Sequence, residues 1–559
     1  MTYRRPVPTI GDPTSAAERA QAPDAWALPD DIGALGRVIG ARRDIRRFRP
    51  DPVPEAVLGT VLEAGHRGPS VGHSQPWRFI VVTEAATRDR AAVMADRCRL
   101  RQAAGMTEES ARGLLDLRLE GIREAPLGIV VACDRRTPAA GVLGRATFPD
   151  TDLWSCAAAI ENMWLTARAH GLGLGWVTLF EPAELAGLLG LPDGVETLGW
   201  LCLGWPDERP PEPGLERAGW SKRLPLEQVV MRERWSEVSA PVSHLRAPGQ
   251  ADVVAARDRA DELLGVPGSL GVLDTVLDRI EALPVRAGRG TLVIAAADHA
   301  VTAYGISAFD PSVTADVARA TREGRSMGAV TAASAGLAVD LVDAGVGERR
   351  GDLVTSDALD PETYAALLAL GRERGAAAAG TGLVALGEIG IGNTTVAAAL
   401  AAGLLGLPAF EVVGRGSSAD AAMLERKRDV VRRALARVGD VSPAEAVRRL
   451  GGGELAVLTG VVLGAVEAGA PVVLDGLATS VCALAAVRME PAVAAHLVAG
   501  QRSRERAHAL VLTELGLEPL LDLRLRAGEG VGAALAAGLL QTALRLRREV
   551  ARTGTTASC

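Results

Sequence analysis

The 559-residue sequence has few aromatic side chains, few cysteines and no excess of positive charge. Aromatic residues make up only 3% of the chain, so burial must depend on alanine, leucine and valine. The six cysteines are scattered, with no CxxC or Cys/His spacing, which argues against a disulfide framework or a structural zinc site and favours a reducing cytoplasm. The net charge of −7 argues against a nucleic-acid partner, which would require a basic face.

Long apolar runs are also missing. The most apolar stretch, VAAALAAGLLGLPAF at residues 396–410, is too short to cross a bilayer and consists mostly of alanine, leucine and glycine. The N-terminus lacks the apolar core of a signal peptide, and we expect residues 1–28 to form a disordered leader. These absences predict a soluble cytoplasmic protein that does not associate with membranes.

Tryptophan divides the chain into two parts. All nine tryptophans lie at or before residue 235, and the later half is dominated by alanine, glycine, valine and leucine. Between the halves, residues 236–254 mix serine, proline and glycine without hydrophobic periodicity, as an interdomain connection should. We therefore predict two unlike domains, with the following segments: 29–238, a linker at 239–260, 261–552, and a tail at 553–559.

The two halves differ in their expected secondary structure. The first mixes helical segments, one of them at 31–48, with short β-branched runs that predict strands. The second alternates apolar strand-like runs, including 455–464, with alanine-rich helices, which indicates a parallel α/β sheet. Ligands of such sheets bind at the carboxyl ends of the strands, where the glycine-rich turns of this sequence fall.

Three segments of the first half could form one pocket. RRDIRRF (42–48) supplies guanidinium groups that can grip phosphate, GPSVGHSQPWRFIVV (68–82) is a small-residue turn before a strand, and GLGLGWVTLF (171–180) offers backbone N–H groups. Each also has a plain explanation, as a solvated helix face, a turn or a core strand. In this order they resemble the nitroreductase-like flavoprotein superfamily, and more closely its 5,6-dimethylbenzimidazole synthase branch, in which the first turn reads RRDxR.

That resemblance covers residues 30–235 and implies an α+β homodimer that holds FMN across its subunit interface. It also implies that reduced FMN is consumed as a substrate with O2 to give dimethylbenzimidazole, and that a separate flavin reductase supplies it. Asp44 would transfer protons at the breaking ring, and Thr178 stands where the family usually has serine. The residues expected to bind FMN are Arg42, Arg43, Asp44, Ile45, Arg46, Ser70, Gly72, Gln75, Gly175 and Thr178.

The second half has three glycine-rich turns before helices, GEIGIGNTT (387–395), VGRGSS (413–418) and LRAGEGVGAAL (525–535). None ends in the GK[ST] of a P-loop or shows the dinucleotide fingerprint. Two of the turns carry a glutamate, Glu388 and Glu529, and paired acids suit a reaction at a sugar carbon. Taken alone, Glu529 between two glycines could equally be a helix start on which the acid complements the helix dipole.

With PGSLG (267–271), ADHAVTAYGISAFDPSVT (297–314) and PVVLDGLATS (471–480), these turns resemble the nicotinate-nucleotide–dimethylbenzimidazole phosphoribosyltransferase family over residues 262–549. The resemblance implies a Rossmann-like three-layer domain that uses nicotinate mononucleotide and needs no metal. Glu529 would be the general base and Glu388 a second catalytic acid. The expected substrate-binding residues are Glu388, Gly390, Ile391, Gly392, Asn393, Thr394, Gly414, Arg415, Gly416, Lys427, Ser503, Gly528 and Glu529.

Together the two resemblances predict a bifunctional enzyme of cobalamin lower-ligand synthesis, which makes dimethylbenzimidazole and attaches it to ribose 5′-phosphate. An NAD(P)H-dependent nitroreductase fused to the same transferase is the main alternative, and a non-catalytic flavin- or nucleotide-binding regulator is another. Gln501 stands where the transferase family commonly has histidine. His299 could contact a ligand, but a hydrogen-bonded core histidine is the favoured interpretation.

Overall fold

The computed structural model describes residues 32–117, 121–233, 235, 243–284, 289–348, 350–416 and 420–553. These residues form two compact units, one before and one after position 236. The predicted leader at 1–28, residues 239–242 of the predicted linker and all but the first residue of the predicted tail lie outside the described residues.

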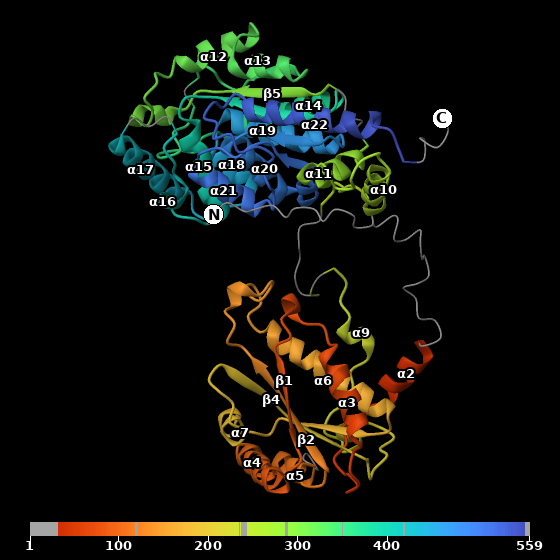
Figure 1. Ribbon diagram of the computed structural model, residues 1–559. Coiled ribbons are helices and arrows are strands. Elements are labelled where there is room, and N and C mark those ends of the chain that lie inside the picture. The colour runs from red at the N-terminus through yellow and green to blue at the C-terminus, as the bar shows by residue number, and fades with distance from the viewer. Residues whose placement is uncertain are drawn as a thin grey trace. The chain divides into compact units, whose positions relative to one another are not determined.

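The first unit is built on an antiparallel sheet with the strand order β1-β2-β4-β3 (Figure 1). The strands are β1 (Trp77–Val82), β2 (Leu127–Asp134), β3 (Gly173–Val177) and β4 (Val195–Gly204). The helices are α2 (Ile32–Ala41), α3 (Glu55–His66), α4 (Ala85–Ala104), α5 (Glu108–Asp116), α6 (Thr151–Ala169), α7 (Pro182–Leu189), α8 (Gly214–Arg217) and α9 (Leu226–Val229), with the 3-10 turns η1 (Val71–His73) and η2 (Ala139–Gly141).

Strand β2 explains why this unit has two cores. Ile129 and Val131 face a cluster formed with α3 and α6, whereas Val130 faces a second cluster formed with α4 and α7. A strand covered on both faces needs apolar residues at successive positions, which is the pattern of LGIVVAC. The α+β fold predicted for the first half is therefore present.

One local prediction in this unit is wrong. The predicted helix at 31–48 ends at Ala41, and the arginine-rich segment after it is extended. Asp44 forms a parallel bridge with Leu174 of β3, and the Ile45 N–H donates to the Leu174 carbonyl over 3.1 Å. The arginines are thus displayed beside the sheet edge instead of along one face of a helix.

The second unit contains a parallel sheet with the strand order β6-β5-β7-β8-β9. The strands are β5 (Thr291–Ala296), β6 (Ala338–Asp343), β7 (Val384–Ile389), β8 (Val472–Leu474) and β9 (Leu497–Ala499). The helices are α10 (Gln250–Asp261), α11 (Val272–Glu281), α12 (Val313–Arg322), α13 (Met327–Ser334), α14 (Pro361–Ala379), α15 (Asn393–Leu405), α16 (Ala409–Val412), α17 (Ala421–Val438), α18 (Pro443–Leu450), α19 (Gly453–Glu467), α20 (Leu477–Met489), α21 (Arg506–Glu514) and α22 (Val531–Glu549), with the 3-10 turns η3 (Ala300–Tyr304) and η4 (Pro491–His496).

Helices cover both faces of this sheet, so the predicted three-layer α/β fold is present (Figure 1). Along β5, Val293 and Ala295 belong to the core shared with α14, α15, α19 and α20, while Leu292 and Ile294 belong to the core shared with α11 and α22. Part of the predicted linker, residues 250–260, is also regular structure, because it forms α10, which packs against α11.

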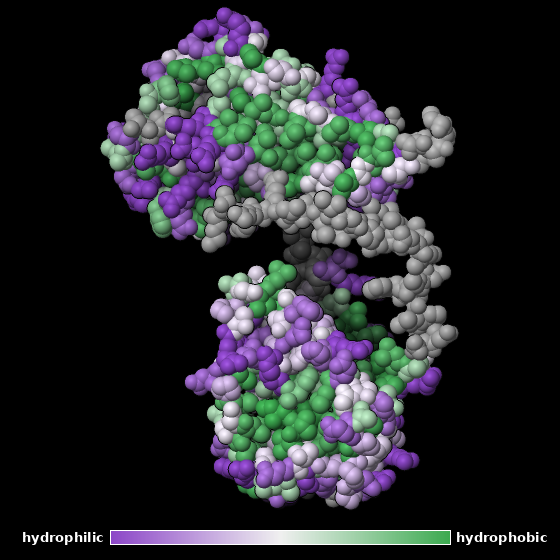
Figure 2. Space-filling view, viewed as in Figure 1, coloured by the Kyte–Doolittle hydropathy of each residue, from purple (hydrophilic) through white to green (hydrophobic). Residues whose placement is uncertain are grey.

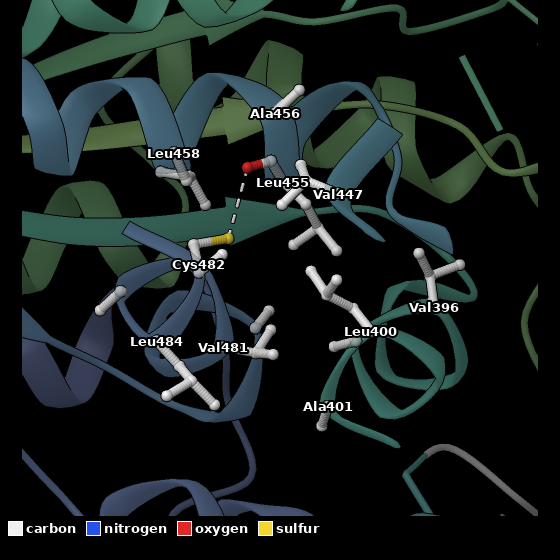
Figure 3. Packing of buried hydrophobic residues seen from close by; sticks show 14 of the residues in the cluster. Val396, Leu400, Ala401, Val447, Leu455, Ala456, Leu458, Val481, Cys482 and Leu484 are labelled. Atoms are coloured by element: carbon white, nitrogen blue, oxygen red, sulfur yellow. Dashed lines mark hydrogen bonds between the residues drawn. The ribbon is translucent and has the colours of Figure 1, made fainter. Parts of the chain in front are cut away.

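The predicted strand at 455–464 is wrong, because this segment lies within α19. Every residue from Gly453 to Val466 is buried, so the helix shows no polar face and its valine-rich run resembles a buried strand. One side of α19 packs against α15, α18 and α20, where the Cys482 thiol donates to the Leu455 carbonyl over 3.4 Å (Figure 3). Among the described residues, no helix is long and apolar enough to cross a membrane.

Candidate active sites

Acidic and polar side chains collect at one edge of the parallel sheet, because the carboxyl ends of parallel strands all meet there. Asp298 and His299 follow β5, Glu388 lies near the end of β7, Asp475 follows β8, and Gln501 lies just after β9. The Glu529 turn approaches this edge from a distant part of the sequence, since the Glu529 N–H donates to the Glu388 carbonyl over 3.2 Å. The two glutamates predicted to act together are thus adjacent.

Glu529 is held in an unusual backbone conformation. Gly528, Glu529 and Gly530 all have positive φ, at 69°, 55° and 77°, which a non-glycine residue rarely adopts. The turn also packs tightly, since a Cβ atom on Gly328 would lie 2.2 Å from the Glu529 carbonyl oxygen. The two glycines around Glu529 therefore allow this turn. The turn fixes the position of the Glu529 carboxylate, in addition to starting α22.

The Glu529 carboxylate is bonded to the backbone at the start of α13. Its Oε2 accepts a hydrogen bond of 3.0 Å from the Gly328 N–H, at the start of α13. Ser326 caps the same helix end by accepting from Ala329 N over 3.2 Å. A carboxylate in this position is stabilised by the partial positive charge of a helix N-terminus, while its other oxygen can accept a ligand proton.

Glu388 differs from Glu529 in its surroundings. Burial raises the pKa of the Glu388 carboxyl well above its ordinary value, and the charges of Asp475, Glu454 and Glu529 raise it further. The Asn393 side-chain amide donates to Glu388 Oε2 and opposes this shift. Glu388 therefore keeps its proton more readily than a solvent-exposed glutamate does.

Asp475 supports the Glu529 turn. Its Oδ1 accepts from Gly532 N over 2.8 Å, from Ala533 N over 3.2 Å and from Gln501 Nε2 over 3.1 Å. Burial raises the pKa of Asp475 to about 6, although these hydrogen bonds oppose the shift. Asp475 thus satisfies the first turn of α22 and ties the helix to β8 and Gln501. Sequence motifs pointed to this loop, but they did not predict its capping role.

The turn at 390–394 leads into α15. Gly392 caps the helix with φ 97°, Asn393 is its first residue, and the Ile391 N–H is bonded to Thr314 Oγ1 over 3.2 Å. Thr394 meets the 414–416 turn, because a Cβ atom on Gly416 would lie 2.7 Å from Thr394 Oγ1. Backbone N–H groups at a helix start are a common site for phosphate.

Lys427 and Glu505 form hydrogen bonds with the backbone of the 414–416 turn. Lys427 is buried and its Nζ donates to the Arg415 carbonyl over 2.9 Å. Burial lowers the pKa of the Lys427 ammonium, and the nearby charge of Glu505 opposes the shift. Glu505 Oε1 accepts from Gly416 N over 2.9 Å. A Cβ atom on Gly414 would lie 2.3 Å from Glu505 Oε2, so a larger residue there would displace the Glu505 carboxylate.

Ser503 belongs to a hydrogen-bonded chain with a buried histidine. Its N–H and Oγ lie 3.0 and 2.9 Å from His508 Nδ1, and His508 Nε2 lies 3.0 Å from Ser480 Oγ. Burial lowers the pKa of His508 to about 4, so the ring is neutral and its Nδ1 can accept. Ser503 and Glu505 line an open depression of about 610 Å³, together with Arg502, Arg504, Arg506, Ala509, Asp522 and Arg524.

In the first unit, Asp44 and Arg46 lie together against β3. Arg46 forms an ion pair with Asp44 and donates to the Trp176 carbonyl over 2.9 Å, while Trp176 N donates to Asp44 Oδ1 over 3.1 Å. Although 40% of the Asp44 side chain is accessible, the surrounding protein raises the pKa of its carboxyl, and Arg46 opposes the shift. Gly175 is necessary here, since a Cβ atom would lie 2.2 Å from the Ile45 carbonyl oxygen.

Arginine groups beside Asp44 retain unused hydrogen-bonding capacity. The Nε and Nη1 atoms of Arg46 and the Nε atom of Arg43 are buried without a partner. Arg42 lies along α6, 3.7 Å from the Glu161 carboxylate and 4.6 Å from the Trp164 ring centre. Unpaired guanidinium donors fit an anionic group such as the phosphate of FMN.

The second segment of the predicted flavin pocket also lies on α6. Val71 N donates to Ser155 Oγ over 3.1 Å, and Ser70 Oγ accepts from Gln75 N over 3.1 Å. Gly72, His73 and Gln75 have positive φ, which marks a strained turn. Ser155 and Trp164 are nine residues apart, so the two segments are separated by ~14 Å along α6.

The structure therefore groups some predicted site residues and leaves others apart. Asp44, Arg46 and Gly175 are in contact, while Ser70, Gly72 and Gln75 form their own turn, and no described interaction joins the exposed Thr178 side chain to either group. In the second unit, Glu388, Glu529 and the 390–394 turn lie at one strand edge, and the 414–416 turn with Lys427 meets Thr394 there. Sequence reasoning missed Glu454, Glu505 and His508, whose contacts come from separate elements.

Comparisons with known proteins agree with this geometry. A family model described as phosphoribosyltransferase matches residues 246–557, and the nitroreductase family model matches residues 39–205. Nicotinate-nucleotide–dimethylbenzimidazole phosphoribosyltransferase of Thermus thermophilus is 44% identical over 313 residues, which are 52% of this chain and 93% of the relative. A 5,6-dimethylbenzimidazole synthase of Rhodospirillum rubrum is 43% identical over 184 residues, which are 33% of this chain and 87% of the relative.

One solved structure extends the comparison to the fold. The crystal structure of CobT from Thermus thermophilus matches with 42% identity and a TM-score of 0.52, covering 54% of this chain and 97% of that one. The two resemblances found in the sequence are thereby confirmed. The chain belongs to the phosphoribosyltransferase family through its second unit and carries a 5,6-dimethylbenzimidazole synthase-like domain of the nitroreductase family before it.

Proposed function

We propose that this chain catalyses two consecutive reactions in the synthesis of the lower ligand of cobalamin. The first unit fragments reduced FMN with O2 to give 5,6-dimethylbenzimidazole. The second unit transfers the phosphoribosyl group of nicotinate mononucleotide to this base, which gives α-ribazole 5′-phosphate and nicotinate. The two relatives that are 44% and 43% identical to the respective units carry the names of these two enzymes.

The observation that carries the proposal is the paired arrangement of Glu529 and Glu388 at the carboxyl edge of the sheet. One oxygen of Glu529 is bonded to Gly328 N, and Glu388 lies beside it with a raised pKa. Two neighbouring acids with different environments can divide the roles of base and acid. Glu529 is the proposed base and Glu388 the proposed protonated partner.

In the proposed transfer, a nitrogen of dimethylbenzimidazole forms a bond to C1 of the ribose. The bond from C1 to the pyridine nitrogen breaks, and its electron pair neutralises the positive ring as nicotinate leaves. Glu529 takes the N–H proton of the attacking base. Protonated Glu388 can donate a hydrogen bond to the sugar, and its neutral state avoids repulsion with the Glu529 carboxylate.

The ribose phosphate is proposed to bind between the start of α15 and the 414–416 turn. Thr394 in the first turn of α15 meets the 414–416 turn, and Lys427 supplies a nearby positive charge. The arginine-lined depression beside Ser503 also favours an anionic substrate. We propose that no metal takes part, since the donor has no pyrophosphate and Asp475 is followed by Gly476 instead of a second acid.

In the first unit, Arg43 and Arg46 are proposed to hold the FMN phosphate, because their buried N–H groups lack partners. The strained turn containing Ser70, Gly72 and Gln75 would contact another part of the flavin along α6. When bound, reduced flavin supplies the electrons that activate O2. Asp44 is proposed to move protons, because burial raises the pKa of its carboxyl and so makes its protonated form easier to reach.

A homodimer and an external flavin reductase are the proposed protein partners. Several large apolar side chains beside the two candidate sites are exposed, and Figure 2 shows apolar areas between hydrophilic ones on both units. In the first unit they include Leu143, Phe148 and Trp154 near the Gly72 turn. In the second they include Met327 and Val330 on α13, the helix that holds Glu529. Exposed apolar groups of this kind are typical of subunit contacts.

Replacing Glu529 tests the transfer directly. With nicotinate mononucleotide and added dimethylbenzimidazole, Glu529→Gln should release nicotinate ~10²–10⁴-fold more slowly, because glutamine cannot take the proton. Glu549→Gln is a matched control on the same polypeptide segment, since Glu549 ends α22 and pairs with Arg545 on the surface. Nicotinate release by Glu529→Gln at the wild-type rate would refute the proposed role.

A further inference from the structure

A buried acid–base pair lies beneath the proposed phosphoribosyl site. Glu454, in the first turn of α19, is completely buried, and its Oε1 lies 2.7 Å from His299 Nε2. His299 follows β5 and is itself buried. Burial is the largest single influence and lowers the pKa of His299, but the charge of Glu454 and its close polar contact together outweigh burial and raise that pKa, with a smaller contribution from Asp298. The two side chains therefore form an ion pair.

The imidazole of His299 is enclosed between two glycine segments. A Cβ atom on Gly390 would lie 3.3 Å from His299 Nε2, and one on Gly392 would lie 3.7 Å from His299 Cβ. On the other side, a Cβ atom on Gly452 would lie 2.5 Å from His299 Cε1. The ring thus packs between the 390–393 turn and the start of α19.

The charge of Glu454 also reaches the proposed catalytic acid. Glu454 raises the pKa of Glu388, as do Asp475 and Glu529 from their own elements. Glu454 likewise raises the pKa of the buried Cys482 thiol on α20, where burial is the larger cause. On the remaining side is Arg350, whose Nη1 is buried without a hydrogen-bond partner and would lie 3.1 Å from a Cβ atom on Gly453.

We propose that His299 and Glu454 are positioning residues for phosphoribosyl transfer: the pair supports the 390–393 turn and places a fixed negative charge behind Glu388. The charge favours the protonated form of Glu388 that the transfer uses. His299 in turn supplies the partner that a fully buried carboxylate such as Glu454 needs. This inference rests on the proposed function, in which Glu388 acts as a neutral hydrogen-bond donor.

The pH dependence of transfer by Glu454→Gln separates this role from a purely structural one. Glutamine keeps the shape of the side chain but removes the charge near Glu388. The alkaline limb of kcat for full-length protein, with nicotinate mononucleotide and added dimethylbenzimidazole, should move to lower pH by ~1 unit. KM for either substrate at low pH should stay within twofold of wild type.

An unshifted pH profile with folded Glu454→Gln would overturn the inference. If Glu529→Gln abolishes transfer in the same assay, the proposed function survives that failure, whereas full activity of Glu529→Gln would remove the function itself. If Glu454→Gln does not fold, the second test is ¹⁵N NMR of wild-type protein whose histidine side chains carry the ¹⁵N label. The imidazole signal that His299→Gln removes should remain protonated at a pH where free histidine is neutral, and a neutral ring there would contradict the ion pair.

Discussion

At the scale of single residues, the second unit contains acids whose chemistry is set by their surroundings. Glu388, Asp475 and Glu529 meet at one strand edge, yet each has different partners. Glu388 lies among negative charges, Asp475 caps α22, and Glu529 accepts from the first turn of α13. The glycines that flank Glu529 allow a backbone conformation that otherwise stores strain, and the surrounding close packing holds it in place.

Asp475 makes the stability of the second unit depend on pH. Its pKa rises from 3.8 to about 6 on folding, so the folded protein binds this proton more tightly than the unfolded chain. The contribution of Asp475 to stability is therefore present at low pH and declines as pH rises through the range between these two pKa values. Asp475→Asn removes the titration but can keep the Oδ1 acceptor for Gly532 N.

We expect the difference in unfolding temperature between wild type and Asp475→Asn to change with pH. The unfolding temperature of wild type minus that of Asp475→Asn should be larger at pH 4 than at pH 7, measured by calorimetry. Subtraction cancels the titrating groups that do not interact with Asp475, and the repulsion between Asp475 and Glu388, which only wild type has at high pH, changes the difference in the same direction. A difference that is constant over this range, or that grows with pH, would contradict the raised pKa of Asp475.

At the scale of elements, helices α14 and α19 pack with their backbones unusually close. A Cβ atom on Gly371 of α14 would lie 2.1 Å from the Val457 carbonyl oxygen, and one on Gly460 of α19 would lie 2.3 Å from the Leu368 carbonyl oxygen. Glycine at these positions lets α19 pass directly under the sheet, with Glu454 at its start near the site. The two helices thereby help to set the site geometry.

Gly371→Ala should therefore destabilise the second unit by ~1–3 kcal/mol, because the added methyl group must push two packed helices apart. Gly265→Ala is the control, since no atom lies within 4 Å of the added Cβ and its φ is not positive. The midpoint of urea unfolding, followed by circular dichroism, measures both. Equal midpoints for Gly371→Ala and Gly265→Ala would show that the helices separate without cost.

These elements also show how far sequence reasoning reaches. The turns at the carboxyl ends of the strands could be predicted from the sequence. In a parallel sheet, a glycine and a polar residue directly after an apolar strand are typical of a ligand-binding turn. The strand predicted at 455–464 was wrong because a helix buried on all sides has no amphipathic signal. The helix predicted through 42–48 was wrong because pairing with β3 outweighs local helical spacing.

Residues brought together by tertiary structure were the hardest to find. Glu505 and His508 act through contacts with the 414–416 turn and with Ser503, which no local spacing encodes. Glu454 did leave a signal, because a single acid at the start of the long apolar run GGGELAVL has no solvated face to occupy. A charged residue inside such an apolar run therefore predicts a buried side chain that pairs with a group of opposite charge.

At the scale of the whole molecule, two unlike units share one polypeptide. The proposed product of the first is the proposed acceptor of the second, so the fusion keeps an intermediate near its next site by raising its effective concentration. Asp44 and Glu529 are the residues on which we propose that the two steps depend. Each can be removed by itself, which makes the order of the reactions measurable.

The most direct measurement follows isotopic label from reduced FMN through the full chain. With O2 and nicotinate mononucleotide, mass spectrometry of the wild-type reaction should find labelled α-ribazole 5′-phosphate. Glu529→Gln should accumulate labelled dimethylbenzimidazole, and Asp44→Asn should form neither compound. Labelled α-ribazole phosphate from Glu529→Gln at the wild-type rate, or intact FMN as the only labelled species with wild type, would contradict the account.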